Sequence, residues 1–457
     1  MKFSIKNLGP IKDAQLELGD LTIVCGKNNT GKTYLAYSFF DFLSFVPYGV
    51  KISPLNDEIE TFITTGKAVI DLMGLVDKYN SYFKNGNMKN FMEKLPSLLA
   101  VHEDFVKDAA FEFEASIDEL KQAIIDSQFG ALRVRTSGST FIVGQKRAGQ
   151  TTVECRLESR VDDKTGAAET DHQPARDIII RQLQLLITYI INSRVPDAFI
   201  ITCERTGASV FRNEFIIYKE LALEDDESID RLKELRERFK FQGYPLPIRK
   251  DLDFVLRFNE AVANKSFIAQ EHPEIISFLS SVVGGEYALQ EPNIVKFKPA
   301  GKDVSLTLVE SSSSVRSLTE LNFYLKHKAK KGQILMLDEP ELNLHPEAQR
   351  KIARLLARLV NVGVKVLITT HSDYIIRELN ALIMMKKLSD DHFQTIKEQF
   401  AYEESELLDF NRVKCYVLAD GKTSPMAIDG EYGVSVESFD TTIEQFNQLY
   451  RTLLNGE

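Results

Sequence analysis

The loop formed by residues 26–33 has the residue types that hold a nucleoside triphosphate. Its glycines allow a tight turn in which successive backbone amides face the phosphates. Lys32 can reach the terminal phosphate oxygens and assist catalysis there, and the Thr33 hydroxyl can bind Mg²⁺. The sequence therefore predicts an ATP site that comprises Gly26, Lys27, Asn28, Asn29, Thr30, Gly31, Lys32 and Thr33.

The segments on either side of this loop agree with that prediction. An apolar strand is expected over residues 21–24, and a helix is expected over residues 34–45. The positive end of this helix would point at the phosphates. A Gly/Asn loop that matches by chance is the alternative, and the order strand, loop and helix favours the nucleotide site.

Two adjacent carboxylates end a second apolar strand, which is expected over residues 334–337. Asp338 is predicted to hold Mg²⁺ through water, together with the Thr33 hydroxyl. Glu339 is predicted to polarise the attacking water as a general base. A strand that merely ends in acids is the alternative. Combined with the phosphate loop, the two acids predict a hydrolytic site that uses ATP and Mg²⁺.

A third apolar strand, expected over residues 364–370, is followed directly by His371. A single histidine is more often structural than functional. Here one amphipathic helix, expected over residues 347–360, separates the strand from the one that carries the two acids. We therefore expect His371 to lie beside these acids and to sense the γ-phosphate.

Two further polar segments occupy positions where α/β folds place ligands. Glu204 and Arg205 follow a strand expected over residues 198–203, so Arg205 could contact nucleotide, brace the site or form a surface salt bridge. A serine-rich run over residues 311–317 precedes a helix, and hydroxyls and amides at a helix N-terminus bind anions. Ser313 and Ser314 are predicted to bind the nucleotide of a second subunit.

Composition narrows the class of protein. The chain has 457 residues, of which 44% are hydrophobic, and a net charge of -10, which argues against binding nucleic acid through bulk charge. Its four scattered cysteines predict neither a zinc site nor a disulfide framework and fit a reducing cytoplasm. The most apolar window, residues 178–191, is too short to span a bilayer, so we expect no membrane partner.

The patterning predicts an α/β P-loop NTPase fold with a mixed sheet, an antiparallel β lobe and an α-helical insertion. Residues 1–50 and 284–457 are expected to form the ATPase head, and residues 51–128 the helical insertion. Residues 129–160 are expected to add antiparallel strands to the head. Residues 161–283 are expected to be helical, with one strand at 197–203.

In order along the chain, residues 26–33, 311–317, 337–346 and 369–373 resemble the Walker A, signature, Walker B/D-loop and switch-histidine segments of ABC-type ATPases. The segment Asp-Glu-Pro-Glu with Leu-His-Pro is most similar to the AAA-family subgroup related to OLD nucleases and to Septu- and PARIS-type anti-phage ATPases. The signature departs from that of transporters, because Ser313 and Ser314 stand in place of paired glycines. No glutamine can be assigned to a Q-loop.

The resemblance implies a homodimer or higher oligomer that forms through the ATPase heads. Because the chain shows no TOPRIM-like acid cluster, we expect a nucleotide-gated sensor that controls a separately encoded effector, most plausibly a nuclease, in anti-phage defence. The alternative is a DNA-binding clamp ATPase in repair or chromosome maintenance, so DNA remains a possible partner. A scaffold that binds ATP without turnover is a third alternative.

Overall fold

The computed structural model describes residues 1–49, 52–84, 88–114, 116–137, 140–159, 175–192, 195–217, 243–290, 294–434, 448 and 451–452. These residues divide into two compact units. Unit 1 comprises Met1–Ser4, Phe42–Lys94 and Phe111–Asp197, and unit 2 comprises Ile5–Asp41, Leu95–Ala110 and Ala198–Glu457. Parts of the predicted segments 161–283 and 284–457 lie outside the described residues.

Unit 2 is built on a mixed β-sheet whose central strands are parallel. Its strands follow the order β1-β2-β16-β15-β3-β14-β13-β9. Strands β15, β3, β14, β13 and β9 run parallel to one another, and β16 is antiparallel to β15. The sheet strands are β1 (Lys2–Leu8), β2 (Ile11–Glu17), β3 (Leu21–Cys25), β9 (Ala198–Ile201), β13 (Ile334–Asp338), β14 (Lys365–Thr370), β15 (Val413–Ala419) and β16 (Lys422–Pro425).

The innermost strands are largely apolar and buried because helices cover them. Every residue of β3 and β13 is buried, which explains their continuous apolar runs. The register pairs Asp338 with Thr369, and Thr370 with Cys25, so the three strands end at one edge of the sheet. The predicted α/β class is therefore confirmed, and the ends of these strands form the frame of the site.

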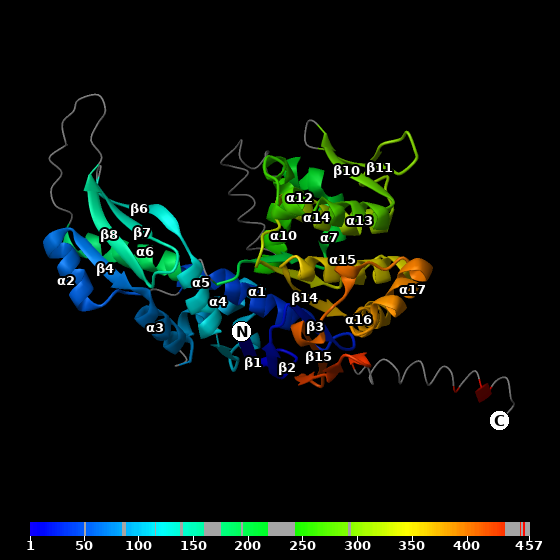
Figure 1. Cartoon of the computed structure of the whole chain (residues 1–457), viewed down its shortest axis with the longest axis horizontal. Coiled ribbons are helices and arrows are strands. Elements are labelled where there is room, and N and C mark those ends of the chain that lie inside the picture. The colour runs from blue at the N-terminus through cyan, green and yellow to red at the C-terminus, as the bar shows by residue number, and fades with distance from the viewer. Residues whose placement is uncertain are drawn as a thin grey trace. The chain divides into compact units, whose positions relative to one another are not determined.

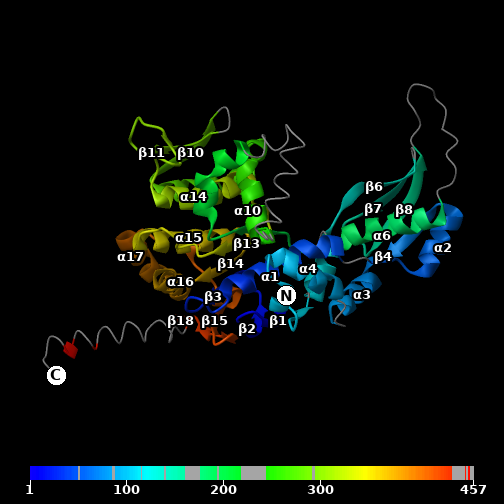
Figure 2. The same ribbon diagram turned by 180° about the vertical axis from the view of Figure 1, so that it is seen from behind.

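Helices and strands of unit 2 lie on opposite sides of α15. In Figure 1, α10, α12, α13, α14 and the β10–β11 ribbon lie above α15, and β3 and β15 lie below it. Figure 2 shows the same order for α10, α14, the β10–β11 ribbon, β3 and β15. The remaining elements are α1 (Lys32–Gly49), α7 (Arg205–Val210), α10 (Leu246–Leu256), α11 (Phe258–Ala261), α12 (Phe267–Glu271), α13 (Pro273–Val283), β10 (Gly285–Gln290), β11 (Ile294–Pro299), β12 (Leu306–Thr307), α14 (Ser313–His327), α15 (Pro346–Asn361), α16 (Asp373–Met385), α17 (Asp390–Phe400), β17 (Ile428–Asp429) and β18 (Gly433–Val434).

Unit 1 contains a four-stranded antiparallel sheet with the order β4-β8-β7-β6. The antiparallel strands expected over residues 129–160 are present in it as β6, β7 and β8, and α6 packs beside them. The elements are α2 (Asn56–Thr65), β4 (Lys67–Asp71), α3 (Leu72–Lys84), α4 (Lys89–Leu99), β5 (Ala110–Glu114), α5 (Ile117–Asp126), β6 (Phe129–Ser137), β7 (Thr140–Lys146), β8 (Thr152–Ser159) and α6 (Arg176–Asn192).

The segment expected to form an α-helical insertion, residues 51–128, also contains the strands β4 and β5. In β4 the side chains of Ala68 and Ile70 are buried and alternate with exposed neighbours, and the strand pairs with β8. Two alternating residues are too few to stand out in a helical background, so partner strands distant in sequence decide this local structure. In the described part of the chain, no helix is long and apolar enough to cross a membrane.

Candidate functional site

The predicted phosphate loop connects β3 to α1 at the edge where the parallel strands end. Gly26 has a φ of 152°, and a Cβ placed on it would lie 2.4 Å from the carbonyl oxygen of Leu418. This close approach of two backbones requires glycine. Asn29 also adopts a left-handed φ, and the Thr30 hydroxyl donates to the Lys27 carbonyl at 2.9 Å. The loop therefore turns tightly before α1 begins at Lys32.

Lys32 points back into this loop. It is only 6% exposed, and its Nζ donates to the carbonyl oxygens of Gly26 at 3.0 Å and of Lys27 at 2.8 Å. Burial lowers the pKa of Lys32, while the nearby carboxylates of Glu339 and Asp338 oppose this shift. The ammonium group is thus held between the loop and the predicted acids. Thr33 follows directly in the first turn of α1.

Asp338 is the last residue of β13 and is almost fully buried. The Thr369 hydroxyl of the neighbouring strand donates to its Oδ1, while Oδ2 has no hydrogen-bond partner in the described structure. Burial raises the pKa of Asp338, and the Thr369 hydrogen bond opposes this. A buried carboxylate oxygen without a partner fits a hard cation such as Mg²⁺, which prefers oxygen ligands.

Glu339 is held in a left-handed backbone conformation, with a φ of 51°. Its N–H donates to the Thr369 carbonyl at 3.0 Å, and its own carbonyl accepts from Arg205 Nη2 at 2.6 Å. A non-glycine residue rarely adopts such a φ unless its surroundings enforce it, and such residues concentrate at functional sites. These two bonds fix the peptide that carries the predicted general base.

His371 lies between the predicted general base and the phosphate loop. Its Nε2 is 2.6 Å from Oε1 of Glu339, and its Nδ1 is 3.4 Å from the Gly26 carbonyl oxygen. The Glu341 carboxylate accepts hydrogen bonds from the His371 backbone N–H and from the Thr370 hydroxyl, both at 2.8 Å. The structure therefore brings together His371, Glu339 and Gly26, as their positions at the ends of neighbouring strands predicted.

The Glu339–His371 pair is expected to make stability depend on pH. Their mutual hydrogen bond raises the pKa of His371 and lowers the pKa of Glu339. The pKa of His371 is higher in the folded protein than in the unfolded chain, so protonated His371 stabilises the fold fully below about pH 6.5. This stabilisation is lost as the pH rises through the pKa that His371 has in the folded protein. Both side chains are partly exposed, so we expect an effect of about 1 kcal/mol or less.

Melting temperatures of the wild type and of His371→Gln across this range would measure the effect. The melting temperature of the wild type should exceed that of His371→Gln most near pH 6, and this difference should shrink towards about pH 9. It should also shrink at acid pH, as the pH falls below the ordinary glutamate value of about 4.3 and through the lowered pKa of Glu339. In a Glu339→Gln background the pH dependence should vanish. A difference that does not change with pH would show that the two side chains do not form an ion pair.

Arg205 braces the protein at this edge of the sheet. It is 3% exposed, which excludes the surface salt bridge. Its Nη1 donates to the carbonyls of Thr202 at 2.9 Å and Asp338 at 2.8 Å, and Nη2 donates to the carbonyl of Glu339. Its Nε donates to Ser317 O and Oγ, both at 3.1 Å. Arg205 therefore joins the strand of the two acids to the helix that follows the serine run.

A pair of buried acids lies behind Arg205. The carboxyl groups of Asp251 and Glu320 interact with each other, and burial raises the pKa of both. Asp251 accepts hydrogen bonds from the backbone N–H of Thr202 at 3.1 Å and from its hydroxyl at 2.6 Å. A raised pKa favours the protonated form, which lets two neighbouring carboxyl groups remain buried. This pair connects α10 and α14 to the end of β9.

Glu204 adds a third carboxylate near Asp338. The Tyr37 hydroxyl, one turn after Thr33 on α1, donates to Glu204 Oε2 at 3.1 Å. Burial and the nearby carboxylates of Asp338 and Glu204 raise the pKa of the Cys203 thiol. The sequence placed Glu204 at a strand end without assigning it a role. Neither Tyr37 nor Cys203 carries a sequence signal for this contact, because it depends on the neighbouring positions of α1 and β9.

The serine run caps α14 and contacts the segment after Glu339. Ser312 accepts from the Val315 N–H at the helix N-terminus, and Ser317 Oγ donates to the Leu342 carbonyl at 2.9 Å. Ser313 is exposed and Ser314 is half-buried. Among the described residues, no hydrogen bond joins Ser313 or Ser314 to the phosphate loop. The serine run therefore contacts the segment after Glu339 in its own chain, while Ser313 is exposed to solvent.

Comparisons with known proteins place the chain in a family. Residues 1–376 match the family described as AAA ATPase domain. A comparison with curated proteins gives no match.

Three solved structures are similar to the chain at low TM-scores. An SMC head bound to the C-winged helix domain of ScpA is 13% identical, with coverage of 96% of this chain and 98% of that chain and a TM-score of 0.36. The SMC head domain from Thermotoga maritima is 11% identical, with coverage of 94% and 98% and a TM-score of 0.31. An Smc head with an extended coiled coil, bound to the C-terminal domain of ScpA derived from Pyrococcus furiosus, is 13% identical, with coverage of 98% and 98% and a TM-score of 0.31.

The assignment rests on the match to the family, which spans residues 1–376 of the 457-residue chain and includes the phosphate loop, both acids and His371. The protein therefore belongs to the AAA ATPase domain family.

Proposed function

We propose that this AAA ATPase hydrolyses ATP at a site shared by two copies of the chain, and that the cycle gates a separately encoded effector. One observation carries the hydrolytic part. His371 contacts both Glu339 and the Gly26 carbonyl, so residues that are far apart in the sequence meet at the phosphate loop. A base, a polar switch and an anion-binding loop in direct contact are the parts that phosphoryl transfer to water requires.

Each side chain then has a separate role in the proposed reaction. Lys32 leaves its carbonyl partners and neutralises the γ-phosphate oxygens. Glu339 accepts the proton of the water whose oxygen bonds to the γ-phosphorus, as the bond from that phosphorus to ADP breaks. His371 moves from Glu339 to the γ-phosphate, which frees the base. When bound at Asp338 and Thr33, Mg²⁺ would neutralise charge on the β- and γ-phosphates.

A second copy of the chain would complete this site. Ser313 and Ser314 present hydroxyls and backbone amides at the N-terminus of α14, where the helix dipole favours an anion. Ser317 on the same helix hydrogen-bonds with Arg205 and with the Leu342 carbonyl. Movement of the serine run would therefore displace the Glu339 peptide, which Arg205 holds. Two heads would therefore close on two ATP molecules, and hydrolysis would open them.

The effector is proposed to be a separate protein because two acids in the described part of the C-terminal segment, Asp420 and Asp429, lie in turns. Asp429 Oδ1 accepts the backbone N–H groups of Glu431 at 2.8 Å and of Tyr432 at 2.7 Å. Asp420 occupies the turn between β15 and β16 with a φ of 50°. Together with the resemblance to OLD-related, Septu-type and PARIS-type ATPases, this supports a sensor that controls a nuclease in anti-phage defence.

Purification from the native operon together with the neighbouring gene products would test this role. We expect a nuclease to co-purify, and the mass of the complex to differ with and without ATP. DNA binding with a steep salt dependence, and no protein partner, would contradict the effector role and favour the DNA clamp. ATP binding without any turnover would contradict the hydrolytic assignment.

A further inference from the structure

Three sulfur atoms meet at the base of the phosphate loop. Cys25 ends β3, Cys415 lies in the adjacent parallel strand β15, and Met426 follows β16. The Sδ of Met426 is 3.7 Å from the Sγ of Cys25 and 3.6 Å from the Sγ of Cys415. The Cys25 thiol also donates to the Tyr416 carbonyl at 3.3 Å. The three sulfurs therefore form a triangle in which the thioether lies in contact with both thiols.

The sheet register explains why the sulfurs converge. Cys25 pairs with Val417, and Cys415 pairs with Ile23. Since side chains two positions apart on a strand share a face, both thiols point to the same side of the sheet. The Met426 N–H donates to the Cys415 carbonyl at 2.8 Å, which holds the thioether over them. The arrangement is fixed by backbone pairing rather than by a flexible loop.

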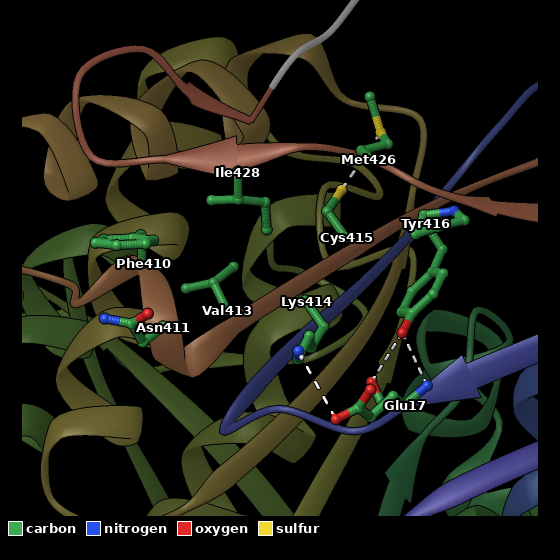
Figure 3. A pocket seen from close by; sticks show the side chains of 10 residues that line it. Glu17, Phe410, Asn411, Val413, Lys414, Cys415, Tyr416, Met426 and Ile428 are labelled. Carbon is green, nitrogen blue, oxygen red and sulfur yellow. Dashed lines mark hydrogen bonds and ion pairs between the residues drawn. The ribbon is translucent and has the colours of Figure 1, made fainter.

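A pocket reaches this triangle from the surface. Cys415 and Met426 line a cavity of about 330 Å³, and Figure 3 shows the Cys415 thiol directed at the Met426 sulfur. The Val413 and Ile428 side chains flank it, and the Glu17–Lys414 ion pair and the Tyr416 hydroxyl lie at the far end. The thiols themselves are almost fully buried, so water is largely kept away from them.

The donor set and its spacing suit a soft cation. Thiolate and thioether sulfur select Cu(I) and similar ions over hard ions such as Mg²⁺. With metal–sulfur distances of about 2.3 Å, a trigonal site has sulfur–sulfur edges of about 4.0 Å. The distances from Met426 Sδ to the two thiol sulfurs are a few tenths of an ångström shorter than this value. Rotation of the unbranched methionine side chain can lengthen both distances. We propose that Cys25, Cys415 and Met426 bind one soft monovalent cation, Cu(I) or its analogue Ag(I).

This site is separate from the nucleotide chemistry and adjacent to it. Cys25 immediately precedes Gly26, whose carbonyl contacts Lys32 and His371. Binding would release protons from the thiols and tie the end of β3 to β15 and to the segment after β16. The proposal does not depend on the proposed effector or on ATP turnover, because it concerns metal binding alone.

Competition between the full-length reduced protein and a colorimetric Cu(I) chelator, under anaerobic conditions, would test the site. We expect the wild type to take up one Cu(I) tightly. Met426→Leu, which conserves volume, should bind at least about tenfold more weakly. Cys415→Ser should lose the tight site. X-ray absorption of the loaded wild type should show three sulfur neighbours at about 2.3 Å.

Cys155→Ser and Cys203→Ser are the matched controls, because each removes a thiol outside the triangle. Both should still bind one Cu(I) with the affinity of the wild type. Circular dichroism would verify that Met426→Leu and Cys415→Ser are folded. Absence of tight binding in the wild type, or equal affinity in Met426→Leu and the wild type, would overturn the proposal.

Discussion

Replacement of Glu339 by glutamine is expected to slow ATP turnover by about 10²–10⁴-fold while ATP remains bound. The amide keeps the shape of the side chain and an oxygen that can face His371, but it cannot accept the proton of the attacking water. Its backbone is held by Thr369 and Arg205, so the substitution should leave the peptide in place. Phosphate release at steady state and nucleotide retained after rapid gel filtration would measure the two effects.

Glu347→Gln is the matched control for this experiment. Glu347 is an exposed residue in the first turn of α15, where it pairs with Lys351. The same change of charge there should leave turnover near that of the wild type. If Glu339→Gln and Glu347→Gln hydrolyse ATP equally fast, Glu339 is not the general base.

Arg205→Lys should separate the rate of turnover from the affinity for ATP. Lysine carries three donors on a point charge, whereas the planar guanidinium of Arg205 reaches five acceptors at once. Buried carbonyls left without donors should lower the free energy of unfolding by about 2–4 kcal/mol. Displacement of the Glu339 peptide should lower kcat by about 10²-fold. The KM for ATP should change little, because Arg205 makes no contact with Gly26 or Lys32.

Chemical denaturation and a KM and kcat determination would check this prediction. The control is Arg257→Lys, since Arg257 is half-exposed and pairs with Asp253 and Glu260. It should change neither stability nor kinetics by much. A rise in the KM of Arg205→Lys at constant kcat would show that Arg205 supports nucleotide binding and does not position the general base.

The sequence was sufficient to predict the central strands and the residues that end them. The strands before Gly26, Glu339 and His371 are buried on both faces, so each appears in the sequence as a mostly apolar run. Each run ends next to residues of the proposed site. Parallel strands joined by one helix must end at the same edge. The meeting of Glu339 and His371 follows from these two facts, whereas the place of Gly26 beside them depends on the pairing of β3 with β14.

The residues that hold the proposed catalytic residues in position could not be predicted in this way. Arg205 looked equally consistent with a nucleotide contact, a brace or a surface ion pair, because its partners are backbone carbonyls that any sequence provides. The role of Glu341 depends on the close approach of His371, and that of Thr369 on its register with Asp338. The Asp251–Glu320 pair joins two helices separated by many residues. Contacts of this kind leave no local pattern in a sequence.

The most direct test of a site shared by two chains is activity restored by mixing two inactive variants. Lys32→Ala should lack a working phosphate loop, and Ser314→Glu should repel the nucleotide of its partner. Each alone should have little turnover. In a head-to-tail heterodimer, the intact phosphate loop of Ser314→Glu faces the intact serine run of Lys32→Ala, so we expect mixing to restore ATP hydrolysis. Turnover in the mixture that equals the sum of the two separate variants, although each is folded, would contradict a site shared by two chains.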